Sequence, residues 1–334
     1  MKIPESPIDL TLDQIRATAS RISKWVDKTP VVRFQGMLVD REPWLANVWL
    51  KLELFQKTGT FKSRGAVNTV LELDREQIQR GITAMSAGNH AVAAAYAAKA
   101  AGASAKIVVQ ASANPIRIEA ARAYGAEIVM APDGKSGFAA AEMLVKNEGR
   151  FFVHPFEGRT VSLGTATLGL ELTEQLPDLD AVVVSIGGGG LASGVAAAIK
   201  LVNPRCKVYG VEPEGAAAMS RSFELKRPTT LDAVNTIADS LAPPMTLPFS
   251  FSLCYKNVDE IATVTDDEIC RAMYILFRDA KLTVEPAGAA ALAAILGPLK
   301  GALNGKKVAS IVCGANIDHS TFFRLIERGE KLAR

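Results

Sequence analysis

The sequence predicts an α/β protein with two open, twisted, mostly parallel sheets flanked by helices. Short runs rich in β-branched residues alternate with alanine-rich stretches along the 334 residues, and this alternation is typical of parallel sheets covered by helices. The length of the chain favours two such sheets over one. The expected strands are NVWLKLEL, ITAMSA, AKIVVQ, AEIVMA, RFFVHPF, AVVVSI, KVYGVEP and VASIVCGA.

The strand and helix units fall into two groups. One group runs from about Gly81 to Phe156, and the other begins near Ala181. We therefore predict a small domain of residues 77–157 inserted into a large domain that comprises residues 1–76 and 158–334. Because ligands of open α/β sheets bind at the carboxyl ends of strands, we expect the chemistry in the loops that follow the strands.

Composition excludes several classes of function. The net charge is only +3, and the basic residues are spread along the chain, so no nucleic acid partner is expected. The polar N-terminus does not resemble a signal peptide. The apolar stretch AVVVSIGGGGLASGVAAAI fits a strand, loop and helix better than a membrane span. We expect a cytoplasmic protein without a membrane partner. The cysteines form no closely spaced set and are expected to be buried free thiols: Cys206, Cys254, Cys270 and Cys313.

Lys62 lies in an unusual loop, FQKTGTFKSRGA. Thr58, Gly59 and Thr60 predict a turn and an N-cap, with a helix beginning near Phe61. Lys62 would then lie in the first helical turn, where the helix dipole disfavours a cation. A desolvated lysine there would have a lowered pKa and could act as a nucleophile or base. On this loop alone, an exposed surface lysine is an equally good interpretation.

Three further loops end expected strands. In SAGNHA, the Ser86 hydroxyl, Asn89 and backbone N–H groups could hold a carboxylate at a helix N-terminus, although a plain β–α turn capped by asparagine is the simpler interpretation. In SIGGGGLASG, four consecutive glycines cost backbone entropy, and close approach of the backbone to a ligand would explain them. The run matches neither GxGxxG nor a P-loop. In IVCGANID, Cys313 alone would be interpreted as a core thiol.

One ligand accounts for all four loops. Pyridoxal phosphate (PLP) bound together with an amino-acid substrate needs a lysine, a phosphate cradle, a polar contact for its heterocycle and a carboxylate site. In the order in which they occur, the motifs resemble those of the serine/threonine dehydratases and serine racemases, which are fold-type II PLP enzymes related to tryptophan synthase β. They are ELFQKTGTFKSRGA, SAGNHA, HPFE, GGGGL, GVEPEGA, VEPAGAAALAA and CGAN. The resemblance implies PLP in the cleft between the two domains, and a homodimer.

The resemblance also implies a role for each matching residue. Lys62 would form the Schiff base, with Phe61 against the cofactor ring and Asn89 at its phenolic oxygen. Cys313 would face the pyridine nitrogen. Glu285 would lie near the ring, with a helix N-terminal carboxylate as the alternative. The phosphate loop would comprise Gly187, Gly188, Gly189, Gly190 and Leu191. The substrate carboxylate would rest on Ser86, Ala87, Asn89 and His90, and Ser86 is counted with Lys62 among the catalytic residues.

The implied activity is dehydration of a β-hydroxy amino acid. Threonine and serine are the default substrates, giving 2-oxobutanoate or pyruvate plus ammonia, with Lys62 as the general base that takes the Cα proton. A neutral Cys313 beside the pyridine nitrogen would favour prompt elimination over transamination. Other substrates within the hypothesis are 3-hydroxyaspartate, phenylserine and a hydroxyectoine-derived compound. The alternative activities are racemisation and β-replacement, and a non-catalytic amino-acid sensor is a different class.

The chain departs from the family pattern at two places that bear on activity. Ala87 stands where racemases with a second-face acid have a serine, which favours dehydration. Ala218 stands where metal-binding members have a carboxylate close to Glu212 and the Ala216 carbonyl. We therefore predict no metal ligand and expect Glu212 to be solvated or ion-paired.

Overall fold

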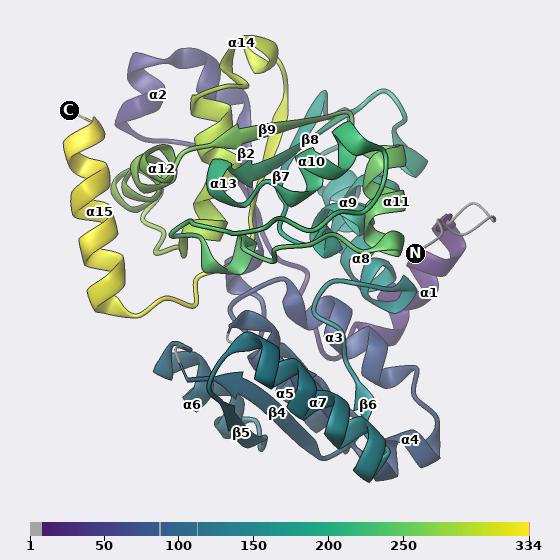
Figure 1. Ribbon diagram of the computed structural model, residues 1–334. Coiled ribbons are helices and arrows are strands. Elements are labelled where there is room, and N and C mark those ends of the chain that lie inside the picture. The colour runs from purple at the N-terminus through teal and green to yellow at the C-terminus, as the bar shows by residue number, and fades with distance from the viewer. Residues whose placement is uncertain (1–8, 87, 112, 334) are drawn as a thin grey trace.

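The computed structural model describes residues 9–86, 88–111 and 113–333 and contains two sheets (Figure 1). The six-stranded sheet has the order β1-β2-β10-β7-β8-β9, and the four-stranded sheet has the order β5-β4-β3-β6. Neighbouring strands are parallel throughout, except for the antiparallel pair β1 and β2. The predicted fold class is confirmed.

The six-stranded sheet lies between two groups of helices. In one group α8 packs on α1 and α9, and α11 packs on α9; in the other, α12 packs on α13 and α15 (Figure 1). The strands of this sheet are β1 (Val31–Arg33), β2 (Val48–Leu52), β7 (Ala181–Ser185), β8 (Lys207–Pro213), β9 (Glu260–Val264) and β10 (Val308–Val312). The helices are α1 (Leu12–Ile22), α2 (Met37–Arg41), α8 (Arg159–Gln175), α9 (Gly190–Val202), α10 (Ala218–Leu225), α11 (Pro248–Asn257), α12 (Asp266–Arg278), α13 (Pro286–Leu296), α14 (Lys300–Leu303) and α15 (His319–Ala333).

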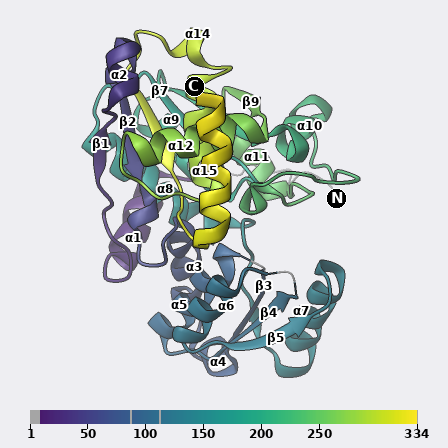
Figure 2. The same ribbon diagram turned by 90° about the vertical axis from the view of Figure 1, so that its left-hand side faces the viewer.

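The four-stranded sheet forms a separate region below the first in both views (Figures 1 and 2). Its elements are β3 (Ile82–Met85), β4 (Ala105–Gln110), β5 (Glu127–Ala131), β6 (Phe151–Phe152), α5 (Asn89–Ala101), α6 (Pro115–Ala123) and α7 (Gly134–Glu148). We call it the small-sheet region, and the part of the chain with the six-stranded sheet the large-sheet region. The exact domain boundaries at residues 77 and 157 stay a prediction.

Every expected strand occurs, and two strands were missed. The edge strand β1 has only three residues, and β1 and β9 are both only partly buried, so neither has the apolar run that marks a buried parallel strand. The expected strand RFFVHPF is reduced to the two residues of β6. Among the described residues, no helix is both long and apolar enough to cross a bilayer.

Helix α3 (Lys62–Leu71) connects the two regions and begins at the candidate lysine. It packs on α5 of the small-sheet region and on α8 of the large-sheet region. The N-cap position belongs to Phe61 rather than to the predicted Thr58–Thr60 segment. The Thr60 hydroxyl nevertheless accepts the Lys62 N–H at 3.3 Å, so threonine still satisfies a donor at the helix start.

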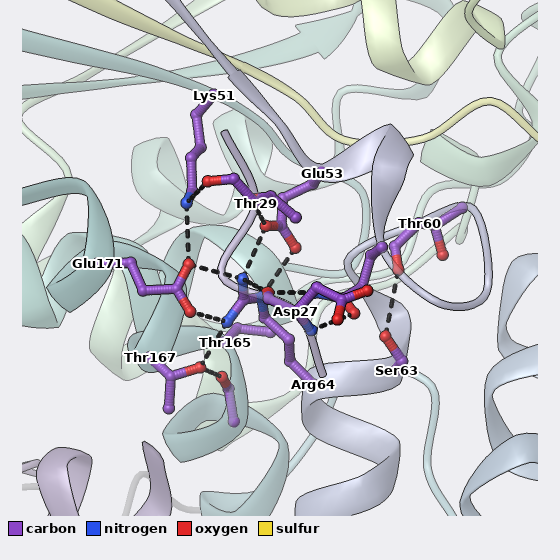
Figure 3. Close-up of polar contacts among 12 residues, drawn as sticks. Asp27, Thr29, Lys51, Glu53, Thr60, Ser63, Arg64, Thr165, Thr167 and Glu171 are labelled. Atoms are coloured by element: carbon purple, nitrogen blue, oxygen red, sulfur yellow. Dashed lines mark hydrogen bonds and ion pairs between the residues drawn. The ribbon is translucent and has the colours of Figure 1, made fainter. Parts of the chain in front are cut away.

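A buried network of charges anchors α3 (Figure 3). Arg64 has no exposed side-chain surface and donates to both oxygens of Glu53 at 2.8 Å. It also donates to both oxygens of Glu171 on α8, at 2.8 and 2.9 Å. Lys51 on β2 donates to Glu171 at 2.8 Å. Burial by itself would raise the pKa of Glu53, but the neighbouring Arg64 outweighs this effect and holds that pKa below its usual value.

We predict that Arg64→Met lowers the free energy of unfolding by about 3–5 kcal/mol, because it leaves the fully buried carboxylate of Glu53 without its cation. Urea unfolding measures the loss. Arg80→Met is the matched control, since Arg80 forms only an exposed pair with Glu76, and it should change stability by about 0.5 kcal/mol or less. Equal effects of the two substitutions would contradict the assignment.

Candidate active site

One cavity of about 870 Å³ gathers residues from both regions. Every predicted site residue that the structure describes lines it, whereas Ala87 lies outside the described residues. These residues follow β3, β7 and β10 or begin α3, α5, α9 and α13, so carboxyl ends of strands converge on one place, as open α/β sheets require. They are Phe61, Lys62, Ser86, Asn89, His90, Gly187, Gly188, Gly189, Gly190, Leu191, Glu285 and Cys313.

Lys62 presents its amine to this cavity. The Nζ atom donates to the carbonyl of Pro155 at 2.6 Å and lies 5.3 Å from the centre of the Phe61 ring. Desolvation lowers the pKa of the amine to about 8, although the nearby Glu285 opposes the shift. An amine with that pKa is partly neutral at pH 7 and can add to an aldehyde.

The glycine loop offers backbone donors at the start of α9. The N–H groups of Gly188, Gly189, Gly190 and Leu191 are buried, and none of them donates to an acceptor in the described parts of the chain. They lie at the positive end of the helix dipole. The loop can therefore hold an anion such as a phosphate group.

The need for glycine at these positions has an explanation within the chain itself, besides the expected approach of a ligand. A Cβ atom at Gly188 would lie 2.4 Å from the ring of Phe156, and one at Gly190 would lie 2.7 Å from the Phe156 Cα. At Gly189 it would lie 2.6 Å from the Met219 side chain, and the residue has a φ of +93°. Tight packing of the loop on its own chain thus accounts for these glycines, and approach of a ligand is not needed to explain them.

Asn89 and Glu285 form a polar pair on the wall of the cavity. Asn89 begins α5 without capping it, and its Nδ2 donates to Glu285 at 2.7 Å and to the Ser240 hydroxyl at 3.2 Å. Glu285 occupies the N-cap position of α13, but its side chain makes no capping hydrogen bond. Burial raises the pKa of this carboxyl to about 7. Asn89 is therefore not a plain asparagine cap, whereas Glu285 is both a carboxylate at a helix N-terminus, the alternative given above, and part of the cavity wall.

Cys313 is a neutral thiol at the end of β10. Its Sγ donates to the Ala287 carbonyl at 3.3 Å, and the Ser185 hydroxyl donates to the same carbonyl at 3.0 Å. Burial raises the pKa of the thiol well above its usual value, so the sulfur carries no charge at neutral pH. The prediction of buried free thiols is confirmed for all four cysteines.

The side chains of Ser86 and His90 have different surroundings. The Ser86 hydroxyl lies at the cavity wall and accepts the Gly88 N–H at 3.1 Å. The His90 ring is buried, and its Nε2 lies 2.8 Å from the Val153 carbonyl. Burial lowers the pKa of His90 to about 3. The neutral ring therefore donates to that carbonyl.

Glu212 was wrongly expected to be solvated or ion-paired. Its carboxylate is buried and accepts the N–H groups of Met219 and Ser220 and the Ser220 hydroxyl, each at 2.7 Å. The side chain satisfies the donors at the start of α10, as a capping carboxylate does. Within the described residues, no group of three or more His, Cys, Asp or Glu side chains could hold a metal ion.

The cavity has walls that sequence patterns did not indicate. Phe156 lies next to the carbonyl that holds the Lys62 amine. The segment 239–245 passes over the glycine loop, since a Cβ atom at Gly187 would lie 3.1 Å from the Leu241 Cα. Arg117 reaches the cavity from α6. Phe156 stands in the motif HPFE, although that motif assigned it no role. A loop leucine or one arginine in a helical pattern carries no signal of its own, so Leu241 and Arg117 could not have been found from sequence.

An amine with a lowered pKa, a set of buried N–H donors and a neutral thiol define a site for an aldehyde cofactor that carries a phosphate. The chain matches the model of the family described as "Pyridoxal-phosphate dependent enzyme" over residues 22–314. It is 49% identical to phenylserine dehydratase from Ralstonia pickettii, over 95% of this chain and 97% of that protein. It is 38% identical to L-threonine ammonia-lyase from Thermotoga maritima, over 96% of this chain and 79% of that protein.

Solved structures agree with these relatives. Maize serine racemase superposes with a TM-score of 0.88 at 34% identity, covering 96% of this chain and 98% of that one. The chain therefore belongs to the threonine dehydratase and serine racemase family of PLP-dependent enzymes. Its cofactor is PLP, and the residues around the cavity fit that cofactor because they provide an amine, an anion site and a neutral partner for a ring nitrogen.

We predict that Gly188→Ala weakens PLP binding by roughly tenfold or more, equivalent to about 1.4 kcal/mol. The added methyl group would overlap the Phe156 ring and displace the loop that offers the N–H donors. Absorbance titration of the apoenzyme with PLP measures the change. Gly301→Ala is the control, since a Cβ atom there meets nothing within 4 Å, and PLP affinity should not change. Unaltered affinity in Gly188→Ala would contradict the prediction.

Proposed function

We propose that the protein is a PLP-dependent dehydratase that acts on a β-hydroxy amino acid with an aryl side chain. With phenylserine as the substrate, the products are phenylpyruvate and ammonia. The observation that carries the proposal is the aromatic and apolar wall beside the reacting amine, formed by Phe156. The phenylserine dehydratase relative at 49% identity supports the same substrate class.

The surroundings of Phe156 favour an apolar substrate side chain. Its ring meets His154 at an interplanar angle of 89° with centres 4.7 Å apart. Although Phe156 is only 8% exposed, it lines the cavity. Arg117, an arginine of the wall, is already paired with two carboxylates, which disfavours 3-hydroxyaspartate. Further apolar side chains that line the cavity are Met85, Phe138, Leu241, Pro243, Pro244 and Met245.

The residues of the site have complementary roles in this proposal. PLP supplies the electron withdrawal that acidifies the substrate Cα–H bond. The Lys62 amine removes the Cα proton, and the Pro155 carbonyl orients that amine beforehand. The Ser86 hydroxyl and the backbone that follows it bind the substrate carboxylate. Asn89 and Cys313 hold the ring, Phe61 packs beside it, and the Gly187–Leu191 loop holds the phosphate. The β-hydroxyl leaves as water, and hydrolysis releases ammonia and the 2-oxo acid.

Racemisation, β-replacement and threonine or serine dehydration are the competing activities. Relatives named as serine racemase and L-threonine ammonia-lyase are 35% and 38% identical, below the phenylserine dehydratase. A non-catalytic amino-acid sensor would not need an amine with a lowered pKa.

We also propose a cytoplasmic homodimer, with PLP between the small domain of residues 77–157 and the large domain.

A panel of β-hydroxy amino acids tests the proposed function. We expect kcat/KM for phenylserine to exceed that for threonine and serine by roughly tenfold or more, because aryl burial against apolar walls is worth at least about 1.4 kcal/mol. Release of the 2-oxo acid and ammonia is measured, and chiral analysis of recovered substrate detects racemisation. Faster turnover of threonine than of phenylserine, or racemisation without 2-oxo acid, would contradict the proposal.

Phe156→Ala tests whether Phe156 selects the substrate side chain, independently of the elimination reaction that phenylserine and threonine share. We expect the ratio of kcat/KM for phenylserine to that for threonine to fall about threefold to tenfold, since one aromatic contact is worth about 0.5–1.5 kcal/mol. The ratio cancels any damage to the glycine loop, which affects both substrates alike. Phe55→Ala, an exposed aromatic residue outside the cavity, should leave the ratio unchanged. An unchanged ratio in Phe156→Ala would remove this residue from the substrate site.

A further inference from the structure

Arg117 is a buried arginine that crosses from the small-sheet region to the large-sheet region. It lies on α6 with only 4% of its surface exposed. Its Nε donates to the Asn316 carbonyl at 3.0 Å, and its Nη1 donates to Asp239 at 2.5 Å. Its Nη2 lies 3.3 Å from Glu285 Oε2. One side chain of the small-sheet region thus contacts three segments of the other region.

Glu285 connects Arg117 to the reaction centre. Its Oε2 accepts from Arg117, and its Oε1 accepts from Asn89 at 2.7 Å. The carboxylate therefore lies between the bridging arginine and a proposed cofactor ligand. The titratable and charged groups that face it are Arg117 from α6, Asp239 from the segment before α11, Lys62 from α3 and Cys313 after β10.

Charges of opposite sign act on this carboxylate. Burial raises the pKa of Glu285 to about 7, the Arg117 cation opposes that rise, and the Asp239 anion adds to it. The thiol of Cys313 is neutral and contributes no full charge. Whether Glu285 is ionised near neutral pH therefore depends on where the Arg117 guanidinium is held.

We propose that Arg117 is a positioning residue for Glu285, which it holds against Asn89 and whose ionised form it favours. It acts through this carboxylate rather than on the substrate, because its guanidinium is already paired with two carboxylates. Arg117 and Glu285 belong to different sheet regions, so the pair forms only when those regions lie together. The inference rests on the PLP family and is independent of which substrate is turned over.

The test is a pH titration of the holoenzyme, followed both by cofactor absorbance and by kcat/KM. Arg117→Met should raise the apparent pKa by about 1–3 pH units, because loss of a nearby opposite charge disfavours the ionised carboxylate. Asp239→Asn should lower the apparent pKa, because it removes an anion that opposes ionisation. Arg117→Lys keeps the cation and should restore most of the wild-type titration.

The opposite signs distinguish this role from a merely structural one. If the arginine only ties the two regions together, Arg117→Met and Asp239→Asn break the same ion pair and should act in the same direction, or lower the melting temperature without moving the titration. Either result overturns the proposal. Should Arg117→Met not fold, the direction of the Asp239→Asn shift still decides, since Asp239 has a 62% exposed side chain and tolerates substitution.

Glu285→Gln provides the second arm. It should abolish the pH-dependent change in cofactor absorbance and in kcat/KM that we assign to Glu285. Adding Arg117→Met to Glu285→Gln should then cause no further shift of either pH profile. A titration that survives Glu285→Gln, or a shift from Arg117→Met that persists in its absence, overturns the proposal. Arg150→Met is the matched control, because Arg150 is also in the small-sheet region but pairs with Glu148 outside the cavity. It should leave the titration unchanged.

Discussion

The buried ion pairs of Arg64 hold the helix start that carries Lys62. Arg64 follows Lys62 by two residues in α3 and is clamped between Glu53, just after β2, and Glu171 on α8 (Figure 3). Buried charges are tolerated only when their partners are well placed, so α3 cannot turn or slide without breaking both pairs. The same helix start brings the Lys62 amine to the Pro155 carbonyl. The ion pairs of Arg64 thus fix the backbone from which the Lys62 side chain enters the cavity.

The site is a cavity lined by residues of two regions, each of which has its own sheet. The large-sheet region provides the glycine loop, Glu285 and Cys313, and the small-sheet region provides Asn89 and the segment before it. Helix α3 packs on both regions and carries the lysine between them. The cavity forms only when the two regions lie together. Side chains that bridge the regions therefore affect the geometry of the whole site as well as their own contacts.

In the proposed function, reaction chemistry and side-chain selection belong to different parts of the cavity. The groups that suit PLP lie at strand ends and helix starts, where the backbone is rigid and few substitutions are tolerated. The apolar wall comes from Phe156, the segment 239–245 and the start of α7. Loops and exposed helix turns can change without disturbing the sheets. Such a separation would allow the same elimination chemistry to be combined with different side-chain pockets, and relatives are named for phenylserine and for threonine.

The sequence by itself determined the fold class, eight of the strands and the loops that meet at the cavity, because these depend on local periodicity and short motifs. Only the tertiary structure decided why Gly188 must be glycine, that Glu212 caps a helix, and that Arg117 meets Glu285 across 168 residues of chain. Edge strands β1 and β9 also formed without a strong local pattern. Glu212 contacts residues only seven and eight positions along the chain, but the bend between β8 and α10 that brings them together has no sequence pattern of its own. The other features are contacts between distant segments, and a local pattern contains no information about which distant side chain will meet it.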